Sequence, residues 1–278
     1  MAKKQLIMEK ALELFAKQGF EATSVQQITE YCGISKGAFY LAYKSKDELI
    51  LALLDHFMEQ YISNIDYTVK NSDNESLLFS FYHSAFQTVQ EHSNFAKLII
   101  KEQAQTFNGE LFIKMQYYDQ LLEQLILALI ERLFGDKATK YDLIYTIRSF
   151  MNVYTGLLLF HNIPFDIERL SQALSEKTTV LAEHATIPFI TEEVAMFMRE
   201  YRIEKEVSKE EVLEIMEQKI KELEESVEKE SLLLLKEEMI NPSYHSAIIA
   251  GLLENIRSHP HCKWVAYLLR NYFGYEKN

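Results

Sequence analysis

The 278-residue sequence contains little glycine and little proline: 8 glycines and 4 prolines, with every proline after residue 163. Because both residues interrupt helices, their scarcity favours an all-helical protein. The two cysteines, Cys32 and Cys262, argue against a disulfide framework and are typical of a reducing, cytoplasmic compartment. Residues 1–4 are not followed by an apolar run, so no signal peptide is expected. The most apolar window, residues 121–134, is short and carries three charges, so no membrane partner is expected.

The sequence also lacks the patterns that carry common enzyme chemistry. It has no glycine-rich phosphate loop, no H-E-x-x-H pair and no nucleophile elbow. His259, His261 and Cys262 could donate metal ligands, but no second ligand pair accompanies them at a recognised spacing. We therefore expect no enzyme, no catalytic residues, no cofactor and no metal site.

What the sequence does contain is apolar and aromatic side chains, and charge of one sign. Apolar residues make up 48% of it, including 17 Phe and 16 Tyr, which is enough for a sizeable core. The net charge is −12, yet residues 1–50 hold seven lysines and six acids, a net charge of +1. A near-neutral head on an acidic body can dock on DNA through one face only.

One stretch of the head, residues 24–43, reads as two short helices joined by a tight turn. Gly33 stands where the first helix must end in a left-handed conformation, which glycine adopts without a Cβ clash. Ser35 is positioned to cap the second helix, which carries Lys36, Gly37 and Tyr40 close together. Small residues beside a lysine and a tyrosine hydroxyl suit a helix that lies in a DNA groove.

Residues 5–54 resemble the DNA-binding domain of the TetR family of transcriptional repressors, and the spacing of the matching residues is highly specific. The departure from the family pattern is at Leu41 and Ala42, where other members often carry polar or aromatic residues. The residues that carry the resemblance are Ala11, Leu14, Phe15, Gly19, Phe20, Thr23, Ser24, Val25, Ile28, Gly33, Ile34, Ser35, Lys36, Gly37, Phe39, Tyr40, Tyr43, Lys46 and Leu49.

The resemblance implies a DNA-binding face. In family members the lysine that corresponds to Lys46 contacts a phosphate, and the capped start of the second helix grips another. Gln26 and Lys36 are the expected donors to bases. The complete expected DNA-binding set is Thr23, Ser24, Gln26, Ser35, Lys36, Gly37, Ala38, Tyr40, Leu41 and Lys46.

The chain divides into three expected domains: a helix-turn-helix head over residues 1–50, a helical effector-binding and dimerisation body over 51–190, and an acidic helical extension over 191–278. The polar run 71–76 lacks helical periodicity and is expected to be a loop. In the family the last two body helices pair with the partner subunit. Helices are expected at 5–18, 46–70, 75–92, 94–107, 110–133, 139–162, 166–186, 243–258 and 260–273, with one or two more in 191–240.

Aromatic residues between body helices suit a small hydrophobic effector, although most must be core. The acidic, aromatic-rich body favours a lipophilic cation as the effector, and a fatty-acyl compound is an equally good candidate. The expected pocket residues are Phe79, Tyr82, His83, Phe86, Phe107, Phe112, Met115, Tyr118, Met151 and Tyr154; Glu102, Gln103, Glu123 and His161 are further candidates for polar contacts.

The sequence thus predicts a homodimeric DNA-binding regulator, a repressor of a palindromic operator that a small effector releases. The alternative is a helical protein-interaction module with a degenerate DNA-binding head, whose acidic tail binds a protein partner. Residues 191–240 hold 16 acids and 8 bases, a pattern that also fits a plainly solvated helix face.

Overall fold

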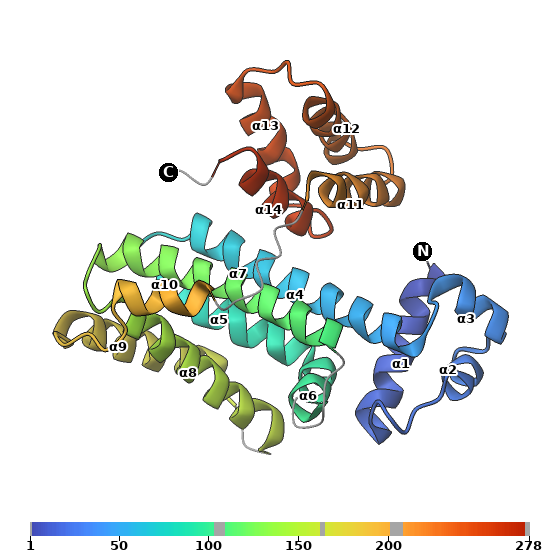
Figure 1. Cartoon of the computed structure of the whole chain (residues 1–278), viewed down its shortest axis with the longest axis horizontal. Helices are drawn as coiled ribbons and strands as arrows, with labels where there is room; N and C mark the ends of the chain where they lie inside the picture. Colours follow the sequence, from blue (N-terminus) through green and yellow to red (C-terminus); the bar gives the residue numbers. More distant parts are fainter. Residues whose placement is uncertain (1, 103–108, 162–164, 201–207, 276–278) are drawn as a thin grey trace. The chain divides into compact units, whose positions relative to one another are not determined.

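The computed structural model describes residues 2–102, 109–161, 165–200 and 208–275, and over these residues the chain folds into 14 helices and no strand (Figure 1). The expected all-α class is confirmed. The helices are α1 (Ala2–Gln18), α2 (Val25–Cys32), α3 (Lys36–Ala42), α4 (Lys46–Asn71), α5 (Leu77–Glu91), α6 (Ser93–Glu102), α7 (Gly109–Phe134), α8 (Lys140–Phe160), α9 (Ile167–His184), α10 (Glu192–Glu200), α11 (Lys209–Glu222), α12 (Val227–Ile240), α13 (Ser246–Arg257) and α14 (Lys263–Tyr272).

The helices form two compact units rather than three. One comprises Met1–Tyr61 with Thr68–Ile203, and the other comprises Ile62–Tyr67 with Glu204–Asn278. The predicted head and body therefore lie in one unit, because α1 packs on α6 of the body. The boundary after residue 190 also differs, because α10 and the segment before it belong to the first unit. There the backbone N–H groups of Phe189 and Ile190 donate to Asp142 of α8, at 3.1 and 3.2 Å.

The core of the first unit follows from helical periodicity. Ile7, Ala11 and Phe15 form the buried stripe of α1. Deeper in the unit, α5 packs on α8 and α9. The fully buried Tyr82 of α5 shares a 2.7 Å hydrogen bond with Thr178 of α9, so the hydroxyl is satisfied inside the core.

One helix of this unit stands out by composition. Among the described helices, α8 is the one whose length and hydropathy, a mean of 1.3 over 18 residues, would allow it to cross a membrane. The window selected from sequence, residues 121–134, lies in α7 instead. Only 28% of the α8 window is buried within the chain; most of its other residues are half-buried, and Val153 and Phe160 are its exposed large apolar side chains.

The second unit gathers α11 to α14 with a six-residue stretch of α4. Arg270 of α14 forms an ion pair with Asp66 of that stretch, and both side chains are buried. Lys263 donates to Asn64 over 2.9 Å. Residues 191–240 contain three described helices, α10, α11 and α12, where one or two were expected.

The apolar run of α12 is only half buried. Leu232, Leu235 and Met239 are in the core, whereas Leu233 and Ile240 are exposed. Consecutive leucines cannot all face one side of a helix, so part of this run must point outward.

Candidate nucleic-acid interface and ligand cavity

The two short helices α2 and α3 are set by local capping. Ser24 caps α2: its hydroxyl accepts from the Gln27 N–H at 3.2 Å, and the Gln27 side chain accepts from the Ser24 N–H at 2.8 Å. Gly33 ends α2 with a left-handed φ of 66°. Ser35 then caps α3 by accepting from the Ala38 N–H at 3.1 Å. Both caps are satisfied by residues within the motif, so the turn angle is encoded locally.

The exposed face of this pair carries polar and apolar side chains together. Lys36 of α3 donates to the side chain of Gln26 of α2 across 3.3 Å, so the structure brings these two residues together. Tyr40 is 53% exposed and Leu41 is 90% exposed. Ser24, Ser35 and Gly37 are exposed on the same motif, and Ala38 is half-buried. The face therefore offers amide, ammonium and phenol donors around a glycine.

Two residues of the expected interface hold the fold instead of facing solvent freely. Thr23 is 1% exposed, and its hydroxyl donates to the Gly19 carbonyl at 2.7 Å. Lys46 donates to the Phe20 carbonyl at 2.8 Å, and its ammonium lies 4.2 Å from the centre of the Phe20 ring. Both residues fix the loop before α2. Lys46 has three donors and uses one here, which leaves its ammonium able to meet a further acceptor.

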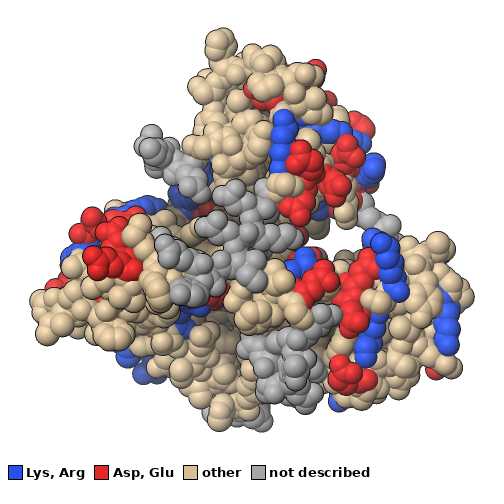
Figure 2. All heavy atoms as spheres, in the orientation of Figure 1, with Lys and Arg blue, Asp and Glu red and all other residues tan. Residues whose placement is uncertain are grey.

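The charge on the first three helices is mixed. Lysines and acids lie side by side on this end of the first unit in Figure 2, in keeping with the near-neutral charge of residues 1–50. Some pairs are intramolecular: Lys10 of α1 lies 2.8 Å from Glu13, whose other oxygen accepts from the Tyr31 hydroxyl at 2.6 Å. The Lys10 ammonium and the Tyr31 hydroxyl hold the pKa of Glu13 below its ordinary value.

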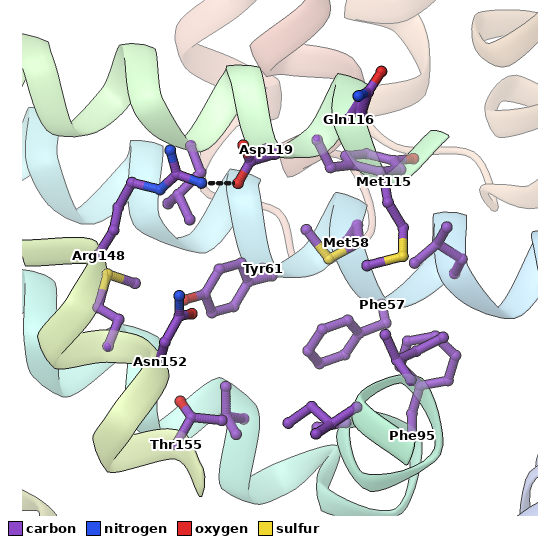
Figure 3. A pocket seen from close by; sticks show the side chains of 18 of the residues that line it. Phe57, Met58, Tyr61, Phe95, Met115, Gln116, Asp119, Arg148, Asn152 and Thr155 are labelled. Atoms are coloured by element: carbon purple, nitrogen blue, oxygen red, sulfur yellow. Dashed lines mark hydrogen bonds and ion pairs between the residues drawn. The ribbon is translucent and has the colours of Figure 1, made fainter. Parts of the chain in front are cut away.

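A cavity of about 570 Å³ opens inside the first unit (Figure 3). This volume is within the range of about 300–1,000 Å³ that is usual for ligand pockets. Its wall comes from α4 to α8 and is mostly aromatic and aliphatic. The lining residues are Leu54, Phe57, Met58, Tyr61, Val89, Phe95, Ala96, Ile99, Ile100, Phe112, Met115, Gln116, Tyr118, Asp119, Leu122, Arg148, Met151, Asn152 and Thr155.

Two groups of polar side chains brace this wall. Arg148 of α8 pairs with Asp119 of α7 and lies 3.3 Å from Glu123, which is buried. On α7, Tyr118 donates to Asp55 of α4 at 3.0 Å, and Lys114 pairs with the same carboxylate at 2.6 Å. Burial and the Asp55 charge both raise the pKa of Tyr118, so its hydroxyl remains a donor.

The structure places the expected pocket residues in two groups. Phe112, Met115, Tyr118 and Met151 line the cavity. Phe107, Gln103 and the side chain of Glu102 lie outside the described residues. Elsewhere, Tyr82 and Phe86 are buried core, the Phe79 and His83 rings stack at 5.5 Å, Tyr154 is half-buried away from the wall, and His161 is exposed.

Sequence reasoning missed the contribution of α4 and α6. Phe57, Met58 and Tyr61 of α4, and Phe95 and Ile99 of α6, line the cavity. Their helical spacing is the same as that of core residues, so periodicity alone could not separate them.

The side chains expected as possible metal ligands do not form a site in the part of the chain that the structure describes. Within the described ranges no three His, Cys, Asp or Glu side chains come together to hold an ion. Cys262 is buried at the start of α14, and burial raises the pKa of its thiol to about 11. The neighbouring His259 accepts from the His261 N–H at 3.3 Å, which is a local turn contact.

Comparison with known proteins finds the same motif and the same fold. Residues 7–53 match the family model described as bacterial regulatory proteins, tetR family. The uncharacterized HTH-type transcriptional regulator YerO of Bacillus subtilis (strain 168) is 28% identical over 269 residues, covering 91% of this chain and 89% of YerO. YuxN of the same organism, also an uncharacterized HTH-type transcriptional regulator, is 27% identical over 266 residues and covers 91% of both chains. Because only about a tenth of this chain lies outside these matches, they include much of the C-terminal unit.

Solved structures share the fold of a smaller part of this chain than the sequence relatives cover. The TetR family regulator PfmR from Thermus thermophilus has a TM-score of 0.54 and 20% identity, covering 62% of this chain and 96% of PfmR. AibR, solved in complex with isovaleryl coenzyme A and operator DNA, has a TM-score of 0.52 and 15% identity, covering 63% of this chain and 97% of AibR. The fatty acid degradation regulator FadR from Bacillus halodurans has a TM-score of 0.54 and 17% identity, covering 66% of this chain and 96% of FadR.

Proposed function

The chain is a helix-turn-helix transcriptional regulator of the TetR family, and from this premise we propose that it is a homodimeric repressor of a palindromic operator. A small apolar effector that fills the cavity releases it from DNA. The protein works in the cytoplasm, where it meets its operator. Family and fold point to a DNA-binding regulator and not to an enzyme. Nothing in the comparisons supports the alternative of a protein-interaction module with a degenerate head.

The observation that carries the effector mechanism is the position of α6. One side of α6 lines the cavity through Phe95, Ala96 and Ile99, and the helix also packs on α1 of the DNA-binding head. A second connection is α4, which begins at Lys46 in the head and lines the cavity from Leu54 to Tyr61. A ligand that enlarges the cavity therefore moves both helices that hold the head. It must bind the released arrangement more tightly, since otherwise it could not shift the equilibrium.

The DNA contacts we propose follow the exposed face of α2 and α3. Gln26 and Lys36 lie 3.3 Å apart and read bases in the major groove, where Gly37 and Ala38 allow close approach. The phenol of Tyr40, the second donors of Lys46 and the N-terminus of α2 at Ser24 position the head on phosphates. Ser35 and Thr23 act by capping and by holding the loop. Leu41, at the solvent end of α3, offers an apolar contact to a thymine methyl group.

The dimer we propose forms through α8 and α9, which lie side by side in Figure 1. Val153 is 62% exposed and Phe160 is 45% exposed on α8, and Val180 and Leu181 are exposed on α9. Burying this surface against a second copy would present two heads. Their spacing must be about 34–36 Å to meet successive major grooves.

The first test is DNA binding itself. Duplexes selected by the protein from a random-sequence pool should contain inverted repeats and bind with a steep salt dependence. Lys36→Ala should weaken binding to the selected duplex by about 1–3 kcal/mol and relax the base preference at the position that Lys36 reads. Lys221→Ala, an exposed lysine on α11, is the matched control and should bind as the wild type does. Equal affinity for every duplex would contradict an operator-specific regulator.

The second test is the oligomeric state. Val153→Glu places a charge on the exposed face of α8, and we expect sedimentation to show a monomer with weakened operator binding. A variant that remains dimeric with full affinity would show that the subunits pair elsewhere.

A further inference from the structure

We propose that the cavity selects an uncharged amphiphile, an apolar body that carries one neutral hydrogen-bonding group such as an amide, ester, thioester or ketone. Tyr61, Asn152 and Thr155 are the residues that recognise this group. The inference rests on the proposed effector role of the cavity and adds the chemical class of the effector.

The charges on the wall argue against a charged ligand. Among the described lining residues the charged ones are Asp119 and Arg148, and they pair with each other. Arg148 also lies 3.3 Å from the buried carboxylate of Glu123. An anionic head group would have to compete with two carboxylates fixed on α7 for one guanidinium. A cationic head group would have to take Asp119 away from Arg148, which would leave a half-buried guanidinium with one partner fewer.

Three neutral polar side chains of the wall, by contrast, are available. Tyr61 of α4 lies beside Asn152 and Thr155 of α8, on one side of the cavity in Figure 3. Tyr61 is buried, Thr155 is half-buried and Asn152 is exposed. Within the described part of the chain, none of these three side chains has a hydrogen-bond partner in the protein, which distinguishes them from Arg148, Asp119 and Tyr118. Burial raises the pKa of Tyr61, so its hydroxyl stays protonated and can donate. A phenol, an amide and an alcohol together match a carbonyl group or a hydroxyl group.

The opposite side of the cavity suits the apolar body of such a molecule. Phe57, Phe95 and Met115 lie across from Tyr61 in Figure 3, and Met58 is beside them. Flexible thioether side chains next to aromatic rings adapt to ligands of different shape. The geometry therefore fixes one neutral polar group and leaves the shape of the apolar part less restricted.

A head-group series tests this directly. Octanamide, octanoate and octyltrimethylammonium have the same alkyl chain, and their binding to the full-length protein can be compared by calorimetry. We expect octanamide to bind at least about tenfold more tightly than either ion, because an ion would lose water without gaining a partner. Tyr61→Phe should weaken octanamide binding by about two- to tenfold, the effect of one hydrogen bond. Tyr154→Phe, a tyrosine of α8 off the cavity wall, is the matched control and should not change it.

Several results would overturn the inference. Tighter binding of octanoate that is lost in Arg148→Gln would identify an anionic effector, and tighter binding of octyltrimethylammonium that is lost in Asp119→Asn would identify a cationic one. Equal affinity for all three would mean that the cavity reads no head group. These results leave the effector role of the cavity intact. If the protein binds operator DNA but none of the three molecules, the inference and the effector role of the cavity both fail.

Discussion

Replacing Gly37 by alanine should make the protein more stable but weaken its binding to DNA. The variant therefore tests whether the glycine is present for the fold or for the DNA interface. Gly37 is the second residue of α3, and its φ is not positive, unlike that of Gly33. A Cβ built at this position would meet only the Ser35 hydroxyl, at an ordinary 3.8 Å. Because the helix has no steric reason for glycine there, alanine should stabilise the protein by about 0.4–1 kcal/mol through the unfolded state.

The expected effect on DNA binding has the opposite sign. Gly37 lies on the exposed face of α3, between Lys36 and the 53%-exposed Tyr40. If this face lies against DNA, an added methyl group is an overpacking change, which typically costs about 1–3 kcal/mol. That corresponds to an increase in Kd of about 5- to 150-fold.

Two measurements on the same variant decide the matter: urea unfolding for stability, and fluorescence anisotropy with a selected duplex for affinity. Gly251→Ala is the matched control, since Gly251 is an exposed helical glycine of α13 with nothing within 4 Å of an added Cβ. It should gain similar stability and keep full affinity. A Gly37→Ala protein that is more stable and binds DNA unchanged would refute the placement of this face in the groove.

Three further predictions concern the ion pair, the loop and a titrating side chain. Arg270→Met should destabilise the C-terminal unit by about 3–5 kcal/mol in urea unfolding, because it leaves the buried Asp66 carboxylate without its guanidinium. The double variant Arg270→Met with Asp66→Leu should recover most of this stability, because no buried charge is left behind. A double variant that recovers nothing would contradict this explanation. Lys46→Ala should lower stability by about 0.5–1.5 kcal/mol through its bond to Phe20 and also reduce the salt slope of DNA binding by about 1, so an unchanged slope would remove its phosphate role. Burial lowers the pKa of His92 below its ordinary 6.5, so the unfolded chain takes up the proton first as the pH falls. The free energy of unfolding should therefore decline as the pH drops from 6.5 through the folded-state pKa. Urea midpoints measured across this range should show the decline, and His92→Gln should flatten it.

The sequence predicted the helix boundaries of the head closely because the signals that set them are local. Ser24, Ser35 and Ser45 each cap the helix that follows, and Gly33 ends α2 in the left-handed region. Such contacts span three or four residues, so spacing alone identifies them. The same reasoning explains why Asp166 marks the start of α9, where it accepts from the Arg169 N–H at 2.9 Å.

The sequence could not predict contacts between distant segments. The bond from Lys46 to the Phe20 carbonyl spans 26 residues, and nothing in the spacing of either residue indicates it. The cavity wall is a similar case. Tyr82 and Tyr61 are both tyrosines on long helices, yet Tyr82 faces Thr178 of α9 and Tyr61 faces the cavity. Which side of a helix faces a neighbour and which faces a void depends on how the helices cross, and a one-dimensional pattern does not contain that information.

The composition of α8 illustrates why hydropathy needs to be read together with charge. Its length and hydropathy would fit a membrane span, but each of its charged residues, Lys140, Asp142 and Arg148, has a partner within the protein. Lys140 lies 2.8 Å from both Glu131 and Asp136, and Arg148, near the middle of the helix, pairs with Asp119 and Glu123 of α7. In a lipid bilayer these ion pairs would be cut off from water, which is costly for charged groups. In a soluble helical bundle they lie at the edge of the helix packing, where water reaches them. The exposed Val153 and Phe160 of α8 are therefore better matched by a second protein surface than by lipid, which supports the proposal that two copies of the chain meet there.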